Sequence, residues 1–457
     1  MSTIEKHDMT QGKILLPLVS FTIPLVLGNL FQLTYNAADS VIVGKYVGEQ
    51  ALAAVGTSTP IMNIAILLIS GMCMGASVLM SSQYGAKDYD TLSRQISTTM
   101  LAGCGFSVVF SLLMLLLANP VLRLIRVPET AIPEAAAYLR IIFMGLIFTF
   151  MYNFLANTMR ALGDSKTPLY FLVTSAFLNI FGDLFFVVVL RWGVAGSAIA
   201  TVCSEGLCCL LCGIYIKKKI PLLCLGKKWW VFDKSLLGKT VSYGSTSAMQ
   251  QVCLQLGKLI IQSVVNTQGV AVMAAFTAVN RVDDFAYTPQ QNIGHAMTTF
   301  LAQNKGAGHK ERMKKGFQTG LLIELVYSIG LFCVIWGLAP QIMTLFAEDG
   351  DAQVVSLGIS YLHLISWMYI LPGLTNGVQG FFRGIGDLKV TLYSTFMNMF
   401  GRVVAVFVMI RLLQMEFASL AWANMVGWIV MLLFEVPLLV KSCLLYTSPS
   451  PRDYAAS

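Results

Sequence analysis

Oxygen-bearing side chains recur at helical spacing in three apolar stretches of the first half of the chain. Asn179 and Asp183 are four residues apart, and so are Ser197 and Thr201. Residues four apart share one face of a helix, so each pair would point the same way. Asp39 lies in the third stretch, within "FQLTYNAADSVIVG" at 31–44. Ionisable groups inside a membrane span are functional by default, which applies here if these stretches cross a membrane.

The chemistry of these residues suits a proton or a small cation. Two carboxylates brought together repel each other, and binding of H⁺ or Na⁺ would relieve that repulsion. Oxygen ligands suit such ions, and the chain has no His or Cys cluster typical of a transition-metal site. We therefore predict a cation-coupling site formed by Asp39, Asn179, Asp183, Ser197 and Thr201. We expect no cofactor and no metal beyond bound Na⁺, with transported H⁺ as the alternative ion.

Weaker polar candidates lie in or near other apolar stretches: Tyr35, Asn36, Glu205, Lys258, Arg281, Asp283, Asp284 and Arg402. Tyr35 and Asn36 share a helical face with Asp39, which could itself cap a broken helix or reach the outer surface. Arg281 and a neighbouring aspartate could equally form a structural ion pair. Pro24 removes a backbone hydrogen bond from the same stretch as Asp39, so we expect a kink and a movable element there.

The composition places these stretches in a membrane. Hydrophobic residues make up 56% of the chain and charged residues 12%, whereas soluble domains carry about 25% charged residues. Apolar runs of about 20 residues cross a hydrocarbon core as helices, and they lack the alternation of a membrane β-barrel. We predict an all-α integral membrane protein with twelve transmembrane helices, at about 14–42, 52–82, 96–118, 136–159, 168–190, 193–216, 239–265, 270–301, 317–338, 354–380, 388–411 and 417–440.

Lysine and arginine are concentrated in alternate loops, which predicts the orientation. The poor set of loops carries only Lys45, Arg123, Arg126, Arg191 and Arg411. Because the rich side is normally cytoplasmic, we expect both termini inside, in a multi-pass protein of the cell membrane. The net charge of +8 then reflects topology and contact with anionic lipid, and we expect no nucleic-acid partner. No cleavable signal peptide is visible in the sequence.

The two halves of the chain resemble each other. An offset of 223 places Arg160 on Arg383 and Tyr170 on Tyr393, and an offset of 221 fits the earlier part of the halves. We predict two parallel six-helix lobes, 1–216 and 237–441, with a basic cytoplasmic linker at 217–236. Such repeats suit alternating access around a central site, although duplication also builds rigid scaffolds. The Ser/Pro-rich end, 442–457, is expected to be disordered or foreign to the native protein.

The acidic residues of the first half have no acidic counterpart in the second. At the offset of 223 Asp183 falls on Val406, and at an offset of 219 it falls on Arg402. At the offset of 221 Asp39 falls on Ile260. The sequence leaves the choice of register open.

Several segments resemble the multidrug and toxic compound extrusion (MATE) family across residues 10–441. They are "IPLVLGNLFQLTYNAADSVIVG", "SSQYGAKD", "MRALGDSKTPLYFLVTSAFLNIFGD", "WGVAGSAIAT" and "FFRGIGDLKV". The resemblance implies a V-shaped, two-lobed exporter of amphipathic, often cationic compounds, sufficient as a monomer and coupled to H⁺ or Na⁺. It further implies that Asp39, Asn179, Asp183 and Thr201 bind the coupling ion, and that the first helix bends at Pro24.

One branch of the family also uses acids on its seventh and tenth helices, and this chain has none in 239–265 or 354–380. That difference favours coupling in the N-terminal lobe. A lipid-linked precursor flippase of the same superfamily is the alternative, although it would need a strongly cationic cavity. An integral membrane enzyme would need a reactive constellation that the sequence lacks, so we expect no catalytic residues. Small-molecule substrates and lipid are the expected partners, with no obligatory protein partner.

Overall fold

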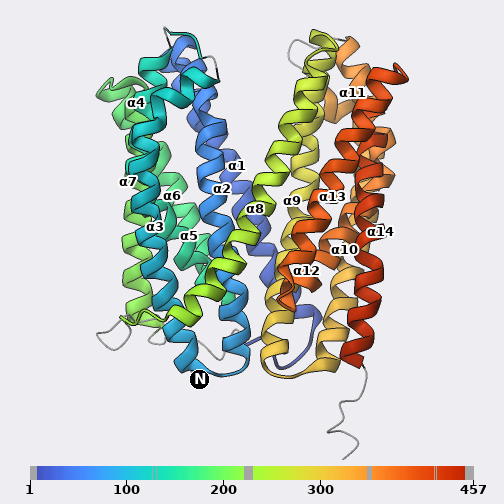
Figure 1. Ribbon diagram of the computed structural model, residues 1–457. Helices are drawn as coiled ribbons and strands as arrows, with labels where there is room; N and C mark the ends of the chain where they lie inside the picture. Colours follow the sequence, from blue (N-terminus) through green and yellow to red (C-terminus); the bar gives the residue numbers. More distant parts are fainter. Residues whose placement is uncertain are drawn as a thin grey trace, which may run out of the picture. The chain divides into compact units, whose positions relative to one another are not determined.

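The computed structural model describes residues 8–125, 127–129, 131–220, 230–346, 352–415, 417 and 419–447. All secondary-structure elements in these residues are helices, and they form twelve helical segments (Figure 1). Each of the twelve predicted spans coincides with one segment, so the predicted all-α class and helix count are confirmed. Four segments are broken into two or three consecutive helices.

The first half contributes six segments: α1 (Leu15–Tyr46), α2 (Glu49–Gly85), α3 (Tyr89–Leu124), α4 (Ile132–Met144) with α5 (Leu146–Ala161), α6 (Lys166–Asp183) with the π-helix η2 (Leu184–Val189), and α7 (Gly193–Lys219). The second half repeats the pattern: α8 (Lys234–Val265), α9 (Val270–Gly306), α10 (Lys310–Phe346), α11 (Ala352–Ser366) with the 3₁₀-helix η6 (Trp367–Tyr369) and α12 (Ile370–Gly384), α13 (Leu388–Val406) with the π-helix η7 (Phe407–Leu412), and α14 (Ser419–Thr447).

Most of these segments have the length and composition of membrane spans. Among the described residues, nine helices are apolar enough to cross a membrane, and α4 with α5, bent by 47°, would make ten. The other two, α8 and α9, are 32 and 37 residues long and carry more polar side chains. Large apolar side chains such as Leu116 and Phe181 are exposed along the helices. Such surfaces suit contact with lipid, where helices satisfy their own backbone hydrogen bonds.

Helix boundaries reproduce the internal repeat and settle its register. The π-helices η2 and η7 are related by the offset of 223 at both ends, so Asp183 is the counterpart of Val406. Segments α2 and α9 are related by an offset of 221, and α1 and α8 by an offset of 219. The counterpart of Asp39 is therefore Lys258, rather than Ile260 as the offset of 221 would give. The loop after α8 is longer than the loop after α1, which accounts for the change of offset.

The chain forms two compact units. Unit 1 contains residues 23–252, and unit 2 contains residues 9–22 together with the described residues from 253 onward. Segments α1 and α8 thus contribute residues to both units, and α1 changes unit next to Pro24. The predicted lobes 1–216 and 237–441 stay a prediction.

The predicted linker and tail are only partly described. Within the linker, α7 continues to Lys219 and α8 begins at Lys234, while residues 221–229 lie outside the described residues. The last helix runs past the predicted boundary at 441 as far as Thr447. Residues 448–457 of the predicted tail lie outside the described residues.

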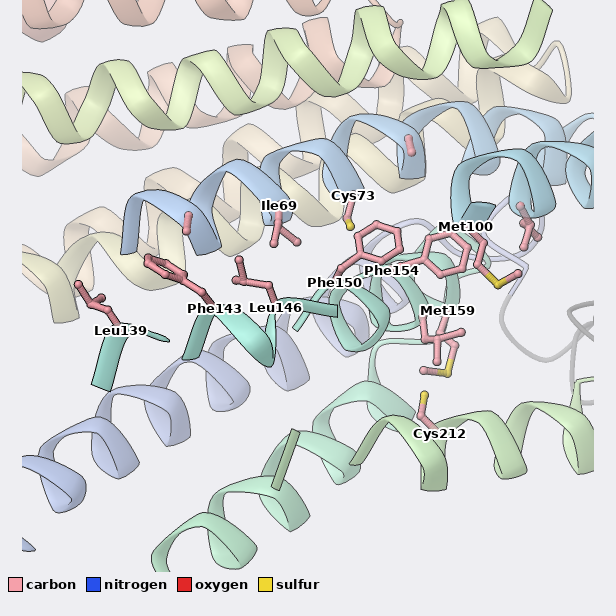
Figure 2. Close-up of a cluster of buried hydrophobic side chains, with 14 of the residues drawn as sticks. Ile69, Cys73, Met100, Leu139, Phe143, Leu146, Phe150, Phe154, Met159 and Cys212 are labelled. Atoms are coloured by element: carbon pink, nitrogen blue, oxygen red, sulfur yellow. The ribbon is translucent and has the colours of Figure 1, made fainter. Parts of the chain in front are cut away.

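The core of unit 1 is an apolar cluster supplied by α2, α3, α4, α5 and α7 (Figure 2). The rings of Phe150 and Phe154 stack with centroids 5.8 Å apart, and Phe143 and Leu146 flank the bend from α4 to α5. Cys73 is free and is buried in this cluster. It behaves as a small apolar side chain, as is usual for buried Cys.

Glycines allow close helix contact within unit 1. A Cβ atom on Gly71 would lie 2.6 Å from Ala248 Cα, and one on Gly75 would lie 2.4 Å from the Tyr243 carbonyl oxygen. Gly71 and Gly75 are four residues apart on α2, and Gly244 and Ala248 are four apart on α8. Pairs of small residues at this spacing let membrane helices approach backbone to backbone, where dispersion contacts hold them together. This contact positions the first half of α8 against α2.

We predict that Gly75→Ala destabilises the protein, because the new methyl group would overlap the α8 backbone. Overpacking of this kind costs about 1–3 kcal/mol. Gly56→Ala is the matched control on α2, since no atom lies within 4 Å of its Cβ position. We expect the control to keep or raise stability, because Ala favours a helix over Gly. Thermal unfolding in detergent measures both, and equal melting temperatures for the two variants would contradict this packing.

Candidate cation-coupling site

The site of interest lies in unit 1, where α6 and α7 pack closely through small residues. A Cβ atom on Gly182 would lie 2.9 Å from Ala200 Cβ, and one on Gly196 would lie 3.1 Å from the Phe186 carbonyl oxygen. Larger side chains at these positions would push the helices apart. The contact brings the polar faces of α6 and α7 together, since Gly182 precedes Asp183 and Gly196 precedes Ser197.

Hydrogen bonds connect the three helices that carry the predicted ligands. Asn179 Nδ2 donates to Thr201 Oγ1 at 3.2 Å, and Thr201 Oγ1 donates to the Ser197 carbonyl at 3.2 Å. Ser197 Oγ in turn donates to Asp39 Oδ1 at 2.6 Å. These hydrogen bonds connect four of the five predicted residues, with α1, α6 and α7 each contributing at least one.

Asp183 is the residue of this group that lacks hydrogen-bond partners within the described part of the chain. Its side chain is 0% exposed, and neither carboxylate oxygen has a hydrogen-bond partner among the described residues. Burial of a charged group without a partner is strongly unfavourable. The side chain of Asp39 lies beside it, close enough for the two carboxyl groups to interact electrostatically. Two carboxyl groups can share a hydrogen bond only when one is protonated, so the pair can hold a proton, or a cation can neutralise it.

The Oδ1 atom of Asn179 is a further acceptor without a partner among the described residues. The Nδ2 atom of the same amide is already engaged with Thr201. The site therefore presents three unpaired acceptor oxygens, two from Asp183 and one from Asn179, and hard cations favour oxygen ligands of this kind.

The π-helix η2 begins directly after Asp183. A π-turn carries one more residue than an α-turn, so it changes which side chains share a face, and such turns are frequent at functional sites. The other copy has the π-helix η7 directly after Val406, where no acid is present. We conclude that the π-helix belongs to the repeated fold, while the acid distinguishes the first copy.

A second layer of polar groups surrounds the carboxylate pair. Thr149 Oγ1 donates to Glu205 Oε2 at 2.5 Å, and Tyr35 lies within electrostatic reach of Glu205 and Asp39. Tyr138 on α4 is buried near both aspartates. Sequence reasoning missed Thr149 and Tyr138 as site residues. The internal repeat, which places Tyr138 on Tyr361, was the one sequence feature that singled out Tyr138. No sequence feature singled out Thr149.

Two predicted residues on α1 need separate mention. The backbone of Asn36 is helical, but its side chain lies outside the described part of the structure. Pro24 is buried, and α1 continues through it from Leu15 to Tyr46.

The remaining secondary candidates lie in unit 2. Lys258 Nζ pairs with Asp284 Oδ1 at 3.4 Å, with both side chains about half exposed. Arg281 is exposed and forms no ion pair within the described residues, so the alternative of an Arg281–aspartate pair is wrong.

Asp283 is buried and well supplied with donors. Its carboxylate accepts from the Tyr361 hydroxyl at 3.0 Å and from the Tyr369 hydroxyl at 2.5 Å. The half-buried Arg402 lies within electrostatic reach. Two hydroxyl donors and a nearby positive charge stabilise this carboxylate inside the protein, in contrast to Asp183.

The MatE family model matches this chain twice, at residues 24–185 and 247–408. The two matches are related by the same offset as the two π-helices, so they reproduce the internal repeat. Both matches cover the helices that carry the repeat, and the first includes Asp39, Asn179 and Asp183.

Curated relatives and solved structures are similar over most of the chain. The probable multidrug resistance protein YpnP of Bacillus subtilis is 32% identical over 392 residues, which cover 85% of this chain and 86% of the relative. The probable multidrug resistance protein YoeA of the same organism is 29% identical, with 83% and 82% covered. An outward-facing multidrug resistance MATE family transporter of the MOP superfamily has a TM-score of 0.91 at 21% identity, with 98% and 100% covered. That structural likeness shows the fold.

The contrast between the two buried aspartates predicts opposite effects on stability. Asp183→Asn removes a carboxylate without donors, so we expect an unchanged or higher melting temperature. Asp283→Asn disrupts two hydrogen bonds from tyrosine hydroxyls, each worth about 1.5–3 kcal/mol with a charged acceptor, so we expect a clear decrease. Thermal unfolding of both variants in the same detergent is the measurement. A decrease for Asp183→Asn as large as for Asp283→Asn would contradict the assignment of Asp183 as unsupported.

Proposed function

Because the chain belongs to the MATE family of multidrug efflux transporters, we propose that it exports amphipathic, often cationic compounds in exchange for H⁺ or Na⁺. The coupling ion binds at Asp39 and Asp183 in unit 1, with Asn179, Ser197 and Thr201 as further oxygen groups. The activity of the family is transport, so these aspartates serve as ion ligands rather than catalytic groups.

The observation that supports this proposal most strongly is the state of Asp183. It is fully buried without a hydrogen-bond donor, beside a second carboxyl group. A residue with a purely structural role would be expected to have donors, as Asp283 has. A carboxylate pair in which one member, Asp183, lacks donors among the described residues is stabilised when an ion enters and destabilised when it leaves, which is the property a coupled carrier needs.

The ion is coupled to the helices through the hydrogen bonds around Asp39. Binding of H⁺ or Na⁺ removes the repulsion between Asp39 and Asp183, so α1 can stay close to α6. Ser197 passes this change to α7, because its hydroxyl donates to Asp39 while its carbonyl accepts from Thr201. Along α1 the change reaches Pro24, next to which the helix passes from one unit to the other. Bending at Pro24 would then open or close the path of the exported compound.

The direction of transport follows from the proposed topology. The Lys/Arg asymmetry of the loops favours cytoplasmic termini and a location in the cell membrane. Asp39 is near the end of α1 opposite the N-terminus, so we propose that the coupling ion enters from outside. Loading favours release of the compound, and unloading to the cytoplasm resets the carrier. We propose that one copy of the chain suffices.

We predict that Asp39→Asn and Asp183→Asn each reduce efflux to the level of cells that lack the protein. Either change removes a negative charge that the coupling ion would otherwise neutralise. Ethidium efflux from pump-deficient bacteria measures the effect, with and without Na⁺ and with a protonophore, so that the driving ion is identified.

Glu129→Gln is the matched control, because Glu129 is an exposed acid of the same unit that lies 3.9 Å from Arg123. It should export like the wild type. Unchanged efflux in both aspartate variants, at equal amounts of protein in the membrane, would overturn the proposed coupling site. Absence of efflux even in the wild type would favour a narrower substrate range or the flippase alternative.

A further inference from the structure

A second carboxylate without partners lies in unit 2, on α10. Glu324 is 1% exposed, and neither of its carboxylate oxygens has a hydrogen-bond partner among the described residues. Gln290 on α9 is 0% exposed, and its Oε1 atom is likewise without a partner there. Three buried acceptor oxygens on these two helices therefore have no hydrogen-bond partner among the described residues.

The side chains of Gln290 and Glu324, together with that of Ser328, converge on a glycine of α12. A Cβ atom on Gly373 would lie 2.9 Å from Ser328 Oγ, 3.2 Å from Gln290 Nε2 and 3.4 Å from Glu324 Oε2. Helices α9, α10 and α12 each contribute to this polar cradle, which we define as Gln290, Glu324, Ser328, Tyr369 and Gly373. The absence of a side chain on Gly373 keeps the space open.

Every hydrogen-bond donor that the side chains of the cradle offer is already used. Gln290 Nε2 donates to the Tyr369 carbonyl at 2.8 Å and to Ser328 Oγ at 3.1 Å. Ser328 Oγ donates to the Glu324 backbone carbonyl at 2.7 Å. Tyr327, beside Glu324, donates its hydroxyl to the Ala286 carbonyl at 3.1 Å. No donor is left for the carboxylate, so the cradle presents acceptors alone.

The cradle also lies at a helix break. α11 ends at Ser366, the 3₁₀-helix η6 covers Trp367–Tyr369, and α12 begins at Ile370. The carbonyl of Tyr369 faces the side chains of Gln290 and Ser328. Carbonyls at interrupted membrane helices and the negative ends of helix dipoles are recurrent cation ligands in transporters.

The equivalent place in unit 1 is apolar. By the offsets of the helices, Glu324 corresponds to Gly103, Gln290 to Ile69 and Gly373 to Phe150. There the ring of Phe150 fills the space over Gly103, with Cζ 2.0 Å from the position of a Cβ atom on Gly103. In unit 1 the small residue is on α3 and the large one on α5. In unit 2 the large residue, Glu324, is on α10 and the small one, Gly373, is on α12. Since a phenyl ring fills this space in unit 1, the repeated helix pattern does not itself call for a polar cradle in unit 2.

We propose that the cradle is a Na⁺ site, with Glu324 and the Oε1 atom of Gln290 as ligands and the carbonyl of Tyr369 and hydroxyl of Ser328 completing it. One carboxylate balances one monovalent cation, whereas a divalent ion would leave a positive charge buried among apolar helices. A proton would satisfy a single pair of these acceptors, and Na⁺ can be shared by all of them. The site differs from the aspartate pair of unit 1, and its acid lies on α10, outside the two spans (239–265 and 354–380) where one branch of the family carries acids.

Binding of ²²Na⁺ to the purified full chain tests this site. The experiment uses the Asp183→Asn background at about pH 8, in choline chloride, so that the aspartate pair of unit 1 is disabled. We expect one saturable Na⁺ site in this background. Adding Glu324→Gln should abolish it, and adding Gly373→Ala should weaken it about 10-fold or more, since a methyl group would occupy the cradle. Because binding is measured without transport, failure of the proposed export function would leave this result unchanged.

Glu435→Gln in the same background is the matched control, because Glu435 is another fully buried acid of unit 2 and has Arg383 within electrostatic reach. Na⁺ binding should persist in this control. Thermal unfolding checks that each variant folds. If Glu324→Gln does not fold, Na⁺ binding by Gly373→Ala decides the outcome. No Na⁺ binding in the Asp183→Asn background would overturn the proposal. Binding that survives both Glu324→Gln and Gly373→Ala would overturn it as well.

Discussion

A carboxylate inside a membrane protein must be paired, protonated or bound to a cation, because neither lipid nor apolar side chains can replace its water. This constraint applies to Asp183 because the helices packed around it bury its side chain completely. Gly182 and Gly196 bring α7 so close to α6 that the acid is enclosed. The donors nearby are directed to other acceptors, with Asn179 bound to Thr201 and Ser197 to Asp39. The surroundings thus leave Asp183 without a hydrogen-bond donor among the described residues.

The duplicated fold shows how one scaffold takes different charges. Both copies share the helix pattern and the π-helix at the same place. Where unit 1 has Asp39 and Asp183, unit 2 has Lys258 and Val406, and where unit 1 has Gly103 under a phenyl ring, unit 2 has Glu324. Each unit therefore contains an unsupported carboxylate in a place that is free of acid in the other. Repetition supplies the frame, and single substitutions decide where a buried acid lies.

Periodicity predicted much of this structure from the sequence. Apolar runs were long enough to define all twelve segments, and i, i+4 spacing placed Asn179 with Asp183 and Ser197 with Thr201 on the faces where they are found. The register of the repeat was not predictable, because the loop after α8 is longer than its counterpart and the change of offset leaves no mark on composition. Arg281 illustrates a second limit, since its charge suggested an ion pair while the geometry pairs Asp284 with Lys258.

The sequence also could not predict which buried acids receive hydrogen bonds. Asp183, Asp283 and Glu324 all lie in apolar surroundings, yet only Asp283 receives donors. Those donors come from tyrosines on a helical segment far along the chain. Whether an acid is supported depends on where distant hydroxyl and amide groups point, and spacing along one helix carries no information on that.

The central claim is that an ion at Asp39 and Asp183 drives export, and purified protein in lipid vesicles tests it most directly. Ethidium movement against its gradient is measured while an opposing gradient of H⁺ or Na⁺ is imposed, for the wild type and for Asp183→Asn. The account predicts that one of the two gradients drives uphill movement by the wild type, and that neither does so for the variant. Equal uphill movement by wild type and variant would contradict it.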